Sequence, residues 1–170
     1  SGFLLSIALF SKAQLKRFSF SQPKMGSVFT VILYDTDSVH AAVTAQECFQ
    51  LVDKYVQVYS DYIDSSELNR LCAAGKTKSP VHVSPALLDI LLLSKKAFEK
   101  SEGSFDITLG PLTHLWRKAR KERVFPDDKT IKEKSALAGF NKIIIDSAAG
   151  TVSLLQEGMQ LDLGGIAQGY

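Results

Sequence analysis

Two neighbouring glycines begin two residues after an acidic residue near the end of the chain, in Asp162-Leu163-Gly164-Gly165. They come after an alternating apolar segment, Met159–Leu163, which predicts a β-strand. Because glycine has no Cβ, its backbone groups can approach a ligand closely, and a helix beginning there would favour a phosphate at its N-terminus. We therefore expect a nucleotide diphosphate to bind at this turn.

The spacing of these glycines matches neither of the common nucleotide-binding motifs. It is not that of G-x-G-x-x-G, and it is not that of the phosphate loop with its Lys-Ser/Thr pair. The same residues also fit a second interpretation, a tight turn in which the Asp162 side chain caps the backbone of the glycines. The turn alone does not decide between the two, so the rest of the chain has to be considered.

The elements that would position this turn alternate irregularly between strands and helices. Helices come in pairs between strands, and the strands are separated by hairpin-like turns such as Ala149-Gly150, so a strict βαβ alternation fails. This order favours an α+β fold over a doubly wound sheet. Strands are expected at 15–20, 28–34, 81–83, 142–146, 151–155 and 159–163.

Helix boundaries follow from capping residues and breakers. Ser38 is the expected N-cap of a helix whose apolar stripe should face a sheet, and Ser65 or Ser66 caps a short helix. Ser84-Pro85 begins a helix over 86–101, which Gly103 ends. A basic helix follows through His114, Trp116, Arg117 and Arg120, and a further helix begins at Pro126-Asp127-Asp128 and ends at Gly139. The residues 22–27 are expected to form a special loop between the first two strands.

Composition indicates one globular domain without a strong net charge. The chain has 170 residues, 45% of them hydrophobic, and a formal net charge of +2, which excludes recruitment of nucleic acid by overall charge. The two cysteines, Cys48 and Cys72, do not make a disulfide framework, and Cys48 is expected in the core. Residues 14–170 are expected to be one portion of a single domain.

The first residues indicate export. Residues 1–13 resemble the remnant of a signal peptide, because an apolar run too short to span a bilayer is followed by Ser11-Lys12-Ala13, with small residues before a cut at Gln14. Since there is no cysteine at the cut, export to the periplasm without a lipid anchor is the simpler expectation. A short buried strand or helix at the N-terminus is the alternative.

Four separated segments of the chain resemble, in order, the motifs of the FAD:protein FMN transferase (ApbE-type) family. Met25-Gly26-Ser27 is similar to M-G-T, and Ser60–Asn69 is similar to S-x-Y…S-E-L. Residues 103–116 are similar to G-x-F-D-I-T-x-G-P-L…L-W, and Leu161–Tyr170 is similar to L-D-L-G-G-I-A-K-G-Y. The third and fourth motifs are specific, and the resemblance covers nearly all of the chain after residue 13.

The resemblance implies an ApbE-like (T-fold-like) domain that is incomplete at its C-terminus, and a transferase. Family members move FMN from FAD to a Thr or Ser hydroxyl of a partner protein, release AMP and use Mg²⁺, and the resemblance implies partners among the subunits of membrane redox complexes. It places the catalytic residues beyond Tyr170, so this chain alone is expected to be inactive, and it assigns the carbonyl of Gly165 to Mg²⁺, which prefers oxygen ligands. The implied contacts with FAD are Met25, Tyr62, Ser104, Phe105, Asp106, Asp162 and Gln168.

Several of these residues also have structural interpretations. Met25 and Phe105 are alternatively core residues, Asp106 is alternatively the cap of the following turn, and Tyr62 is alternatively a half-buried surface aromatic. The charges of the basic helix are expected to form a solvated face, with His114 in a structural role and Trp116 as a packing anchor.

The chain departs from the family motifs at three positions. Ser27 stands in place of Thr and keeps its hydroxyl, and Cys72 stands where many members have Asn. Gln168 stands in place of the common Lys, so its amide can donate to a phosphate but cannot neutralise it. Two other functions therefore stay open: an FAD pyrophosphatase that gives FMN and AMP, and a non-catalytic exported flavin-binding protein.

Overall fold

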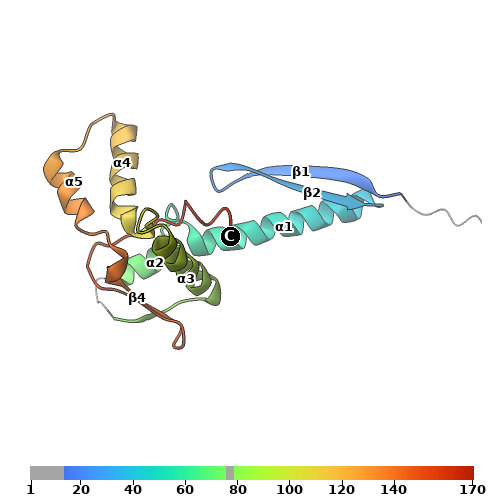
Figure 1. Cartoon of the computed structure of the whole chain (residues 1–170). Helices are drawn as coiled ribbons and strands as arrows, with labels where there is room; N and C mark the ends of the chain where they lie inside the picture. Colours follow the sequence, from blue (N-terminus) through green and yellow to red (C-terminus); the bar gives the residue numbers. More distant parts are fainter. Residues whose placement is uncertain (1–13, 76–78) are drawn as a thin grey trace, which may run out of the picture. The chain divides into compact units, whose positions relative to one another are not determined.

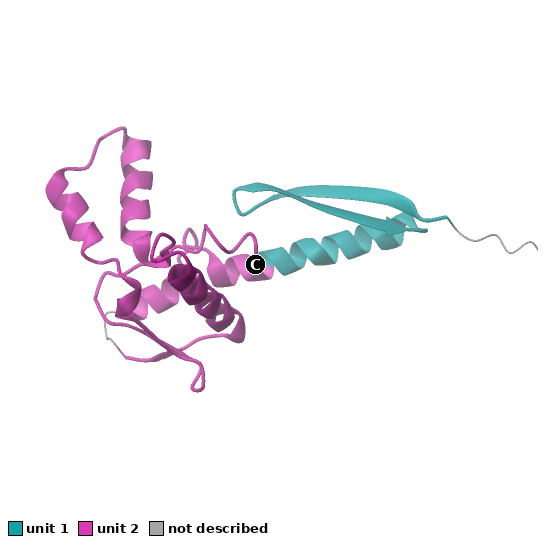
Figure 2. Cartoon of the chain, viewed as in Figure 1, with its two compact units in different colours: residues 1–53 teal, residues 54–170 magenta. Residues whose placement is uncertain are grey.

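The structure is a computed structural model that describes residues 14–75 and 79–170 (Figure 1). It divides into two compact units, Ser1–Asp53 and Lys54–Tyr170 (Figure 2). The expected signal-peptide segment, residues 1–13, lies outside the described residues. Among the described residues, no helix combines the length and the apolar character that crossing a membrane requires.

Unit 1 is built on an antiparallel hairpin of β1 (Lys16–Lys24) and β2 (Ser27–Asp35). Its turn is only two residues long, because Met25 and Gly26 both have positive φ, +50° and +73°, which matches the right-handed twist of a hairpin. The expected loop over 22–27 is therefore wrong in extent, since β1 continues through Pro23 to Lys24. Proline is tolerated there because β1 has a partner on one side only.

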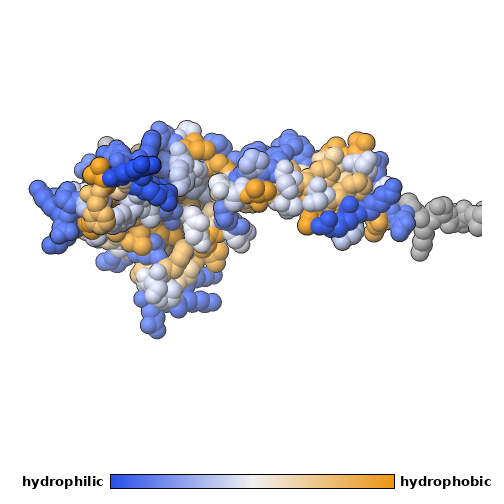
Figure 3. All heavy atoms as spheres, turned by 90° about the horizontal axis from the view of Figure 1, so that it is seen from above, coloured by the Kyte–Doolittle hydropathy of each residue, from blue (hydrophilic) through white to orange (hydrophobic). Residues whose placement is uncertain are grey.

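The two faces of this hairpin differ in exposure. On one face Phe18, Phe20 and Leu33 are half-buried, whereas the opposite face exposes Val28 and Ile32 by 72% and 51%. Figure 3 shows such apolar residues at the molecular surface among polar ones. The two strands were predicted, but the exposed apolar face was not.

Helix α1 (Ser38–Tyr59) provides the buried side of unit 1 through Ala41, Ala45 and Phe49, which follow one another at intervals of four residues. An ion pair of 2.6 Å between Lys24 Nζ and Asp53 Oδ1 also joins the hairpin to this helix. Three expectations for this helix are corrected. Asp37 rather than Ser38 caps it, accepting from the Val39 N–H at 2.7 Å; the stripe residues Val39 and Val43 are exposed; and Cys48 is exposed rather than in the core.

In its described residues, unit 2 combines a small sheet with four helices of its own. The strands β3 (Val81–His82), β5 (Thr151–Leu154) and β4 (Ile143–Asp146) pair antiparallel in that order. The helices are α2 (Glu67–Ala74), α3 (Pro85–Lys100), α4 (Gly110–Glu122) and α5 (Asp128–Ser135), with 3₁₀ turns at Ile107–Leu109 and Phe140–Lys142. This mixture of helices and small antiparallel sheets confirms the α+β expectation.

Most predicted boundaries of these helices are confirmed. Ser66 caps α2 and Ser84 caps α3, each accepting a backbone N–H with its hydroxyl, and Pro85 is the first residue of α3. Gly103 follows α3 with φ +83°. Helix α5 is shorter than expected, because it ends at Ser135 and not at Gly139.

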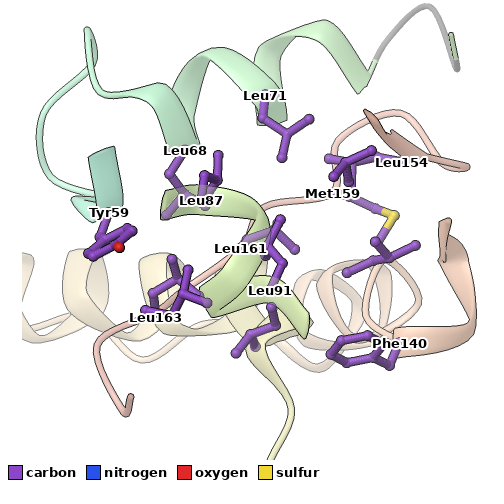
Figure 4. Packing of buried hydrophobic residues seen from close by; sticks show 14 residues of the cluster. Tyr59, Leu68, Leu71, Leu87, Leu91, Phe140, Leu154, Met159, Leu161 and Leu163 are labelled. Carbon is purple, nitrogen blue, oxygen red and sulfur yellow. The ribbon is translucent and has the colours of Figure 1, made fainter. Parts of the chain in front are cut away.

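The core of unit 2 draws buried side chains from the end of α1, from α2, α3, β4 and β5, and from both 3₁₀ turns (Figure 4). The segment Met159–Leu163 contributes Met159, Leu161 and Leu163, all 2% exposed or less. Its alternation was predicted, but the strand was not correct, because the segment belongs to neither sheet. The Leu161 N–H donates to Cys72 Sγ at 3.4 Å, and the Asp162 N–H donates to the Ile107 carbonyl at 2.8 Å.

Candidate functional site

Arg117 of α4 joins two acidic side chains from distant segments of unit 2. Its guanidinium donates to Asp61, in the loop between α1 and α2, and to Asp162 Oδ2 at 2.8 Å. The Asp61 side chain is 6% exposed and the Asp162 side chain 14%. One cation therefore holds together two carboxylates that are largely removed from water. Loss of this cation would leave both carboxylates with less compensation for their burial.

Two further side chains complete this group, which we call the Arg117 cluster: Asp61, Tyr62, His114, Arg117 and Asp162. His114, one helical turn before Arg117, has its Nε2 3.1 Å from Asp61 Oδ2. The guanidinium carbon of Arg117 lies 4.3 Å from the centre of the Tyr62 ring, a cation–π contact. Since Tyr62 is 74% exposed, much of its ring stays accessible for stacking with a ligand.

The charge state of Arg117 follows from these contacts. Burial alone lowers its pKa, but the hydrogen bond to Asp61 and the charges of both carboxylates outweigh that effect and raise the pKa above its ordinary value. The guanidinium is therefore positively charged at neutral pH.

Asp162 also shapes the glycine turn that follows it. Its Oδ1 accepts the Gly164 N–H at 2.8 Å, which is the tight-turn interpretation of this residue. The residues after it form consecutive turns, with the Ala167 N–H donating to the Leu163 carbonyl at 2.8 Å. Asp162 thus links the Arg117 cluster, through one oxygen, to the backbone at Gly164, through the other.

Residues Gly103–Leu112 lie beside this turn. Asp106 caps the short helix at Ile107–Leu109, accepting the Thr108 N–H at 2.8 Å and the Thr108 hydroxyl at 2.7 Å. The capping interpretation of Asp106 is therefore confirmed, which leaves its other oxygen, Oδ2, for any ligand. The Thr108 hydroxyl in turn accepts the Gly139 N–H at 2.7 Å.

Two glycines allow the segments to meet at this place. A Cβ on Gly165 would lie 3.1 Å from Phe105 Cε2, so the half-buried Phe105 ring packs directly against this glycine. A Cβ on Gly110 would lie 2.4 Å from the Gln160 carbonyl oxygen, closer than real contacts allow. The absence of a side chain at these positions brings the backbone of 105–110 against that of 160–165.

The structure thus brings five of the eight predicted site residues into linked segments: Tyr62, Phe105, Asp106, Asp162 and Gly165. Ser104 is exposed on the same loop, and Gln168 is exposed in the final turns. Met25 belongs to the other unit, where it forms the hairpin turn.

Sequence reasoning missed Asp61 and Arg117 as members of the site. The expectation that the charges of α4 form a solvated face is wrong for Arg117, whose side chain is 27% exposed and doubly paired. His114 has the structural contact expected of it, and Trp116 packs against Phe125 while staying 41% exposed. The available signal was the spacing of three between His114 and Arg117, which places both on one face of a helix.

Within residues 14–75 and 79–170, no three His, Cys, Asp or Glu side chains gather in a way that could hold a metal ion. The metal role expected for Gly165 involves its backbone carbonyl and not a side chain.

Comparisons with known proteins place these features in a family. Residues 25–170 match the ApbE family. A FAD:protein FMN transferase of Klebsiella pneumoniae (strain 342) is 32% identical over 154 residues, which cover 90% of this chain and 47% of that protein. A second protein of the same name, from Treponema pallidum (strain Nichols), is 32% identical over 167 residues, or 94% of this chain and 45% of its own length.

Solved structures agree with this sequence comparison. The flavin transferase ApbE of Vibrio cholerae superposes with a TM-score of 0.82 at 26% identity, covering 92% of this chain and 50% of that chain. The apo form of the Pseudomonas stutzeri flavinyl transferase ApbE gives a TM-score of 0.78 at 26% identity, covering 96% and 52%. The chain spans about half the length of these relatives. With its motifs, its fold and these matches, the chain belongs to the ApbE family.

Proposed function

We propose that the complete protein carrying this chain is an FAD:protein FMN transferase. The hydroxyl oxygen of a Thr or Ser on an acceptor protein attacks the FMN phosphorus of FAD, the pyrophosphate bond breaks, and AMP leaves. The observation that carries this proposal is the meeting of three family segments, at Tyr62, Phe105 and Asp162-Gly165, in one place in the fold. The relatives that share these segments are named for this reaction.

The described residues suit the binding of FAD in this reaction. The accessible part of the Tyr62 ring offers a stacking surface for a flavin or an adenine ring. The glycine turn after Asp162 offers backbone groups to the diphosphate at close approach. Exposed Ser104 and Gln168 offer a hydroxyl and an amide.

Mg²⁺ belongs to the same proposal. The carbonyl of Gly165 would supply one hard oxygen ligand, and the ion would neutralise charge on the phosphate oxygens. This contribution matters here because Gln168 brings no positive charge, and because Arg117 is already shared by two carboxylates. The remaining ligands and the base that deprotonates the acceptor are assigned beyond Tyr170.

The setting of the reaction is also part of the proposal. We infer an exported protein that acts on the periplasmic side, from the character of residues 1–13. The acceptor would then be a protein with a Thr or Ser exposed on that side, such as a subunit of a membrane redox complex.

The test uses the complete gene product with FAD, Mg²⁺ and a candidate acceptor protein. We expect a covalently fluorescent acceptor band and stoichiometric AMP, both lost when a chelator removes Mg²⁺. FMN and AMP without a labelled acceptor would identify a pyrophosphatase instead. Tight binding of FAD that stays intact would favour a non-catalytic flavin-binding protein, for which the neutral Gln168 is the supporting observation.

A further inference from the structure

Arg117 has three partners on two segments that are far from it in sequence. Asp61 and Tyr62 are neighbours in the loop before α2, and Asp162 precedes the glycine turn, so the three contacts join α4 to both. Arg117 is separated from Asp61 by 56 residues and from Asp162 by 45. No local preference of the chain would bring these groups together, so the cluster depends on the guanidinium itself.

The charges explain why this position needs an arginine. The carboxylates of Asp61 and Asp162 both approach the same cation, and a planar guanidinium can donate to two carboxylates at once through separate nitrogens. After removal of Arg117, Asp61 would keep its contact with His114, and Asp162 would keep the Gly164 N–H. Two acidic side chains that are 6% and 14% exposed would then repel each other without a shared counter-charge.

We propose that Arg117 is a positioning residue of the flavin site, an inference that rests on the proposed function. It holds the Asp162 carboxylate in the orientation that shapes the Gly164-Gly165 turn, and it holds the Tyr62 ring with one face against the guanidinium and the rest open to stack on a ring of FAD. In this arrangement each terminal nitrogen of Arg117 already donates to a carboxylate, so its positive charge is shared by Asp61 and Asp162. Its contribution is to fix the groups that do contact the nucleotide.

The experiment measures the dissociation constant of FAD by quenching of flavin fluorescence, in the complete protein. We expect Arg117→Met, which keeps an unbranched apolar stem but removes the charge and the donors, to weaken FAD binding about tenfold or more. Arg117→Lys keeps the charge but not the planar pair of donor nitrogens. Its dissociation constant for FAD should lie between those of the unchanged protein and of Arg117→Met. Lys118→Met, the neighbouring exposed position on the same helix, is the matched control and should stay within about twofold of the unchanged protein.

A second substitution separates positioning from simple loss of stability. If Arg117 acts by holding two like charges together, then Asp61→Asn should relieve the repulsion and restore part of the FAD affinity in the Arg117→Met background, while reducing affinity or leaving it unchanged alone. The KM for FAD should follow the dissociation constant, whereas the KM for the acceptor protein should not change. Thermal unfolding of each variant shows how much of the effect is global.

Clear outcomes would overturn the inference. FAD binding by Arg117→Met within twofold of the unchanged protein would end it, and so would a loss of affinity that Asp61→Asn leaves entirely unrelieved. These results differ from a failure of the proposed function, in which the unchanged protein itself would neither bind FAD nor label an acceptor.

Discussion

Single carboxylates at the candidate site can cap a backbone group and still have an oxygen that contacts another group. Asp162 accepts the Gly164 N–H with one oxygen and the Arg117 guanidinium with the other, and Asp106 spends one oxygen on capping. The alternatives that the sequence left open for these residues, a cap or a ligand contact, therefore do not exclude each other. A capped carboxylate is held in one orientation, which is a favourable starting point for recognising a ligand.

The methyl group added by the substitution Gly110→Ala is expected to push apart two segments of the candidate site. The Cβ of Gly110→Ala would lie 2.4 Å from the Gln160 carbonyl oxygen, and both partners are backbone at a buried position, so neither can turn away. We expect a loss of about 1–3 kcal/mol in the free energy of unfolding, measured by urea titration. Gly169→Ala, whose Cβ would be 3.8 Å from the nearest atom, is the control and should change stability by less than about 0.5 kcal/mol.

The two cysteines are expected to differ strongly in reactivity. Burial raises the pKa of the Cys72 thiol to about 11, although the Leu161 N–H that it accepts acts in the opposite direction. Because of this raised pKa, only about one part in a thousand of the Cys72 thiol is ionised at pH 8, and the thiolate is the form that reacts. Alkylation followed by mass spectrometry should modify exposed Cys48 first and Cys72 only after unfolding. Rapid labelling of the half-buried Cys72 in the folded protein would contradict the raised pKa of its thiol.

The start of a helix can be predicted from a few neighbouring residues, whereas the hydrogen-bond partners of an extended segment cannot. Ser66 and Ser84 cap their helices because a hydroxyl three residues before a free N–H suffices, and such a signal lies entirely within a few residues of sequence. The alternation of Met159–Leu163 correctly gave the buried side chains but not the absence of sheet pairing. That segment bonds to Cys72 and to the Ile107 carbonyl, which only the tertiary fold brings close.

The α2 cap can be tested at two adjacent serines that the sequence could not tell apart. The Ser66 hydroxyl is fully buried, accepts the Asn69 N–H at 3.1 Å and donates to the Ser60 carbonyl at 2.6 Å. Ser66→Ala should therefore lower the free energy of unfolding by about 1–2 kcal/mol, because both groups lose their partner. Ser65→Ala, at the exposed neighbouring position, should leave the unfolding curve unchanged. Equal effects of the two substitutions would show that the cap is not where the structure has it.

At the scale of the whole molecule, the fold class and the segments that meet at the candidate site were predictable, and the ionic contacts between them were not. The motifs around Tyr62, Phe105 and Asp162 identified the segments because family motifs are contiguous in sequence. The pairing of Arg117 with Asp61 and Asp162 was missed because charge on a helix is usually solvated, and only long-range packing makes this arginine an exception. The exposed Val39 and Val43 on α1 are a second example. Their helical spacing predicts that apolar residues share one face of the helix, but it does not predict whether the rest of the fold covers that face.

The hairpin of unit 1 has a consequence for handling this polypeptide. Within residues 14–75 and 79–170, no further strand pairs with either outer edge of this two-stranded sheet, so backbone N–H and C=O groups there lack a neighbouring strand. One face of the hairpin also exposes Val28, Ile32 and Tyr34. Edges of this kind are templates for strand addition, and natural proteins protect them by covering or charging them. When the 170-residue chain is produced by itself at high concentration, intermolecular β-pairing through this hairpin is therefore the association to guard against.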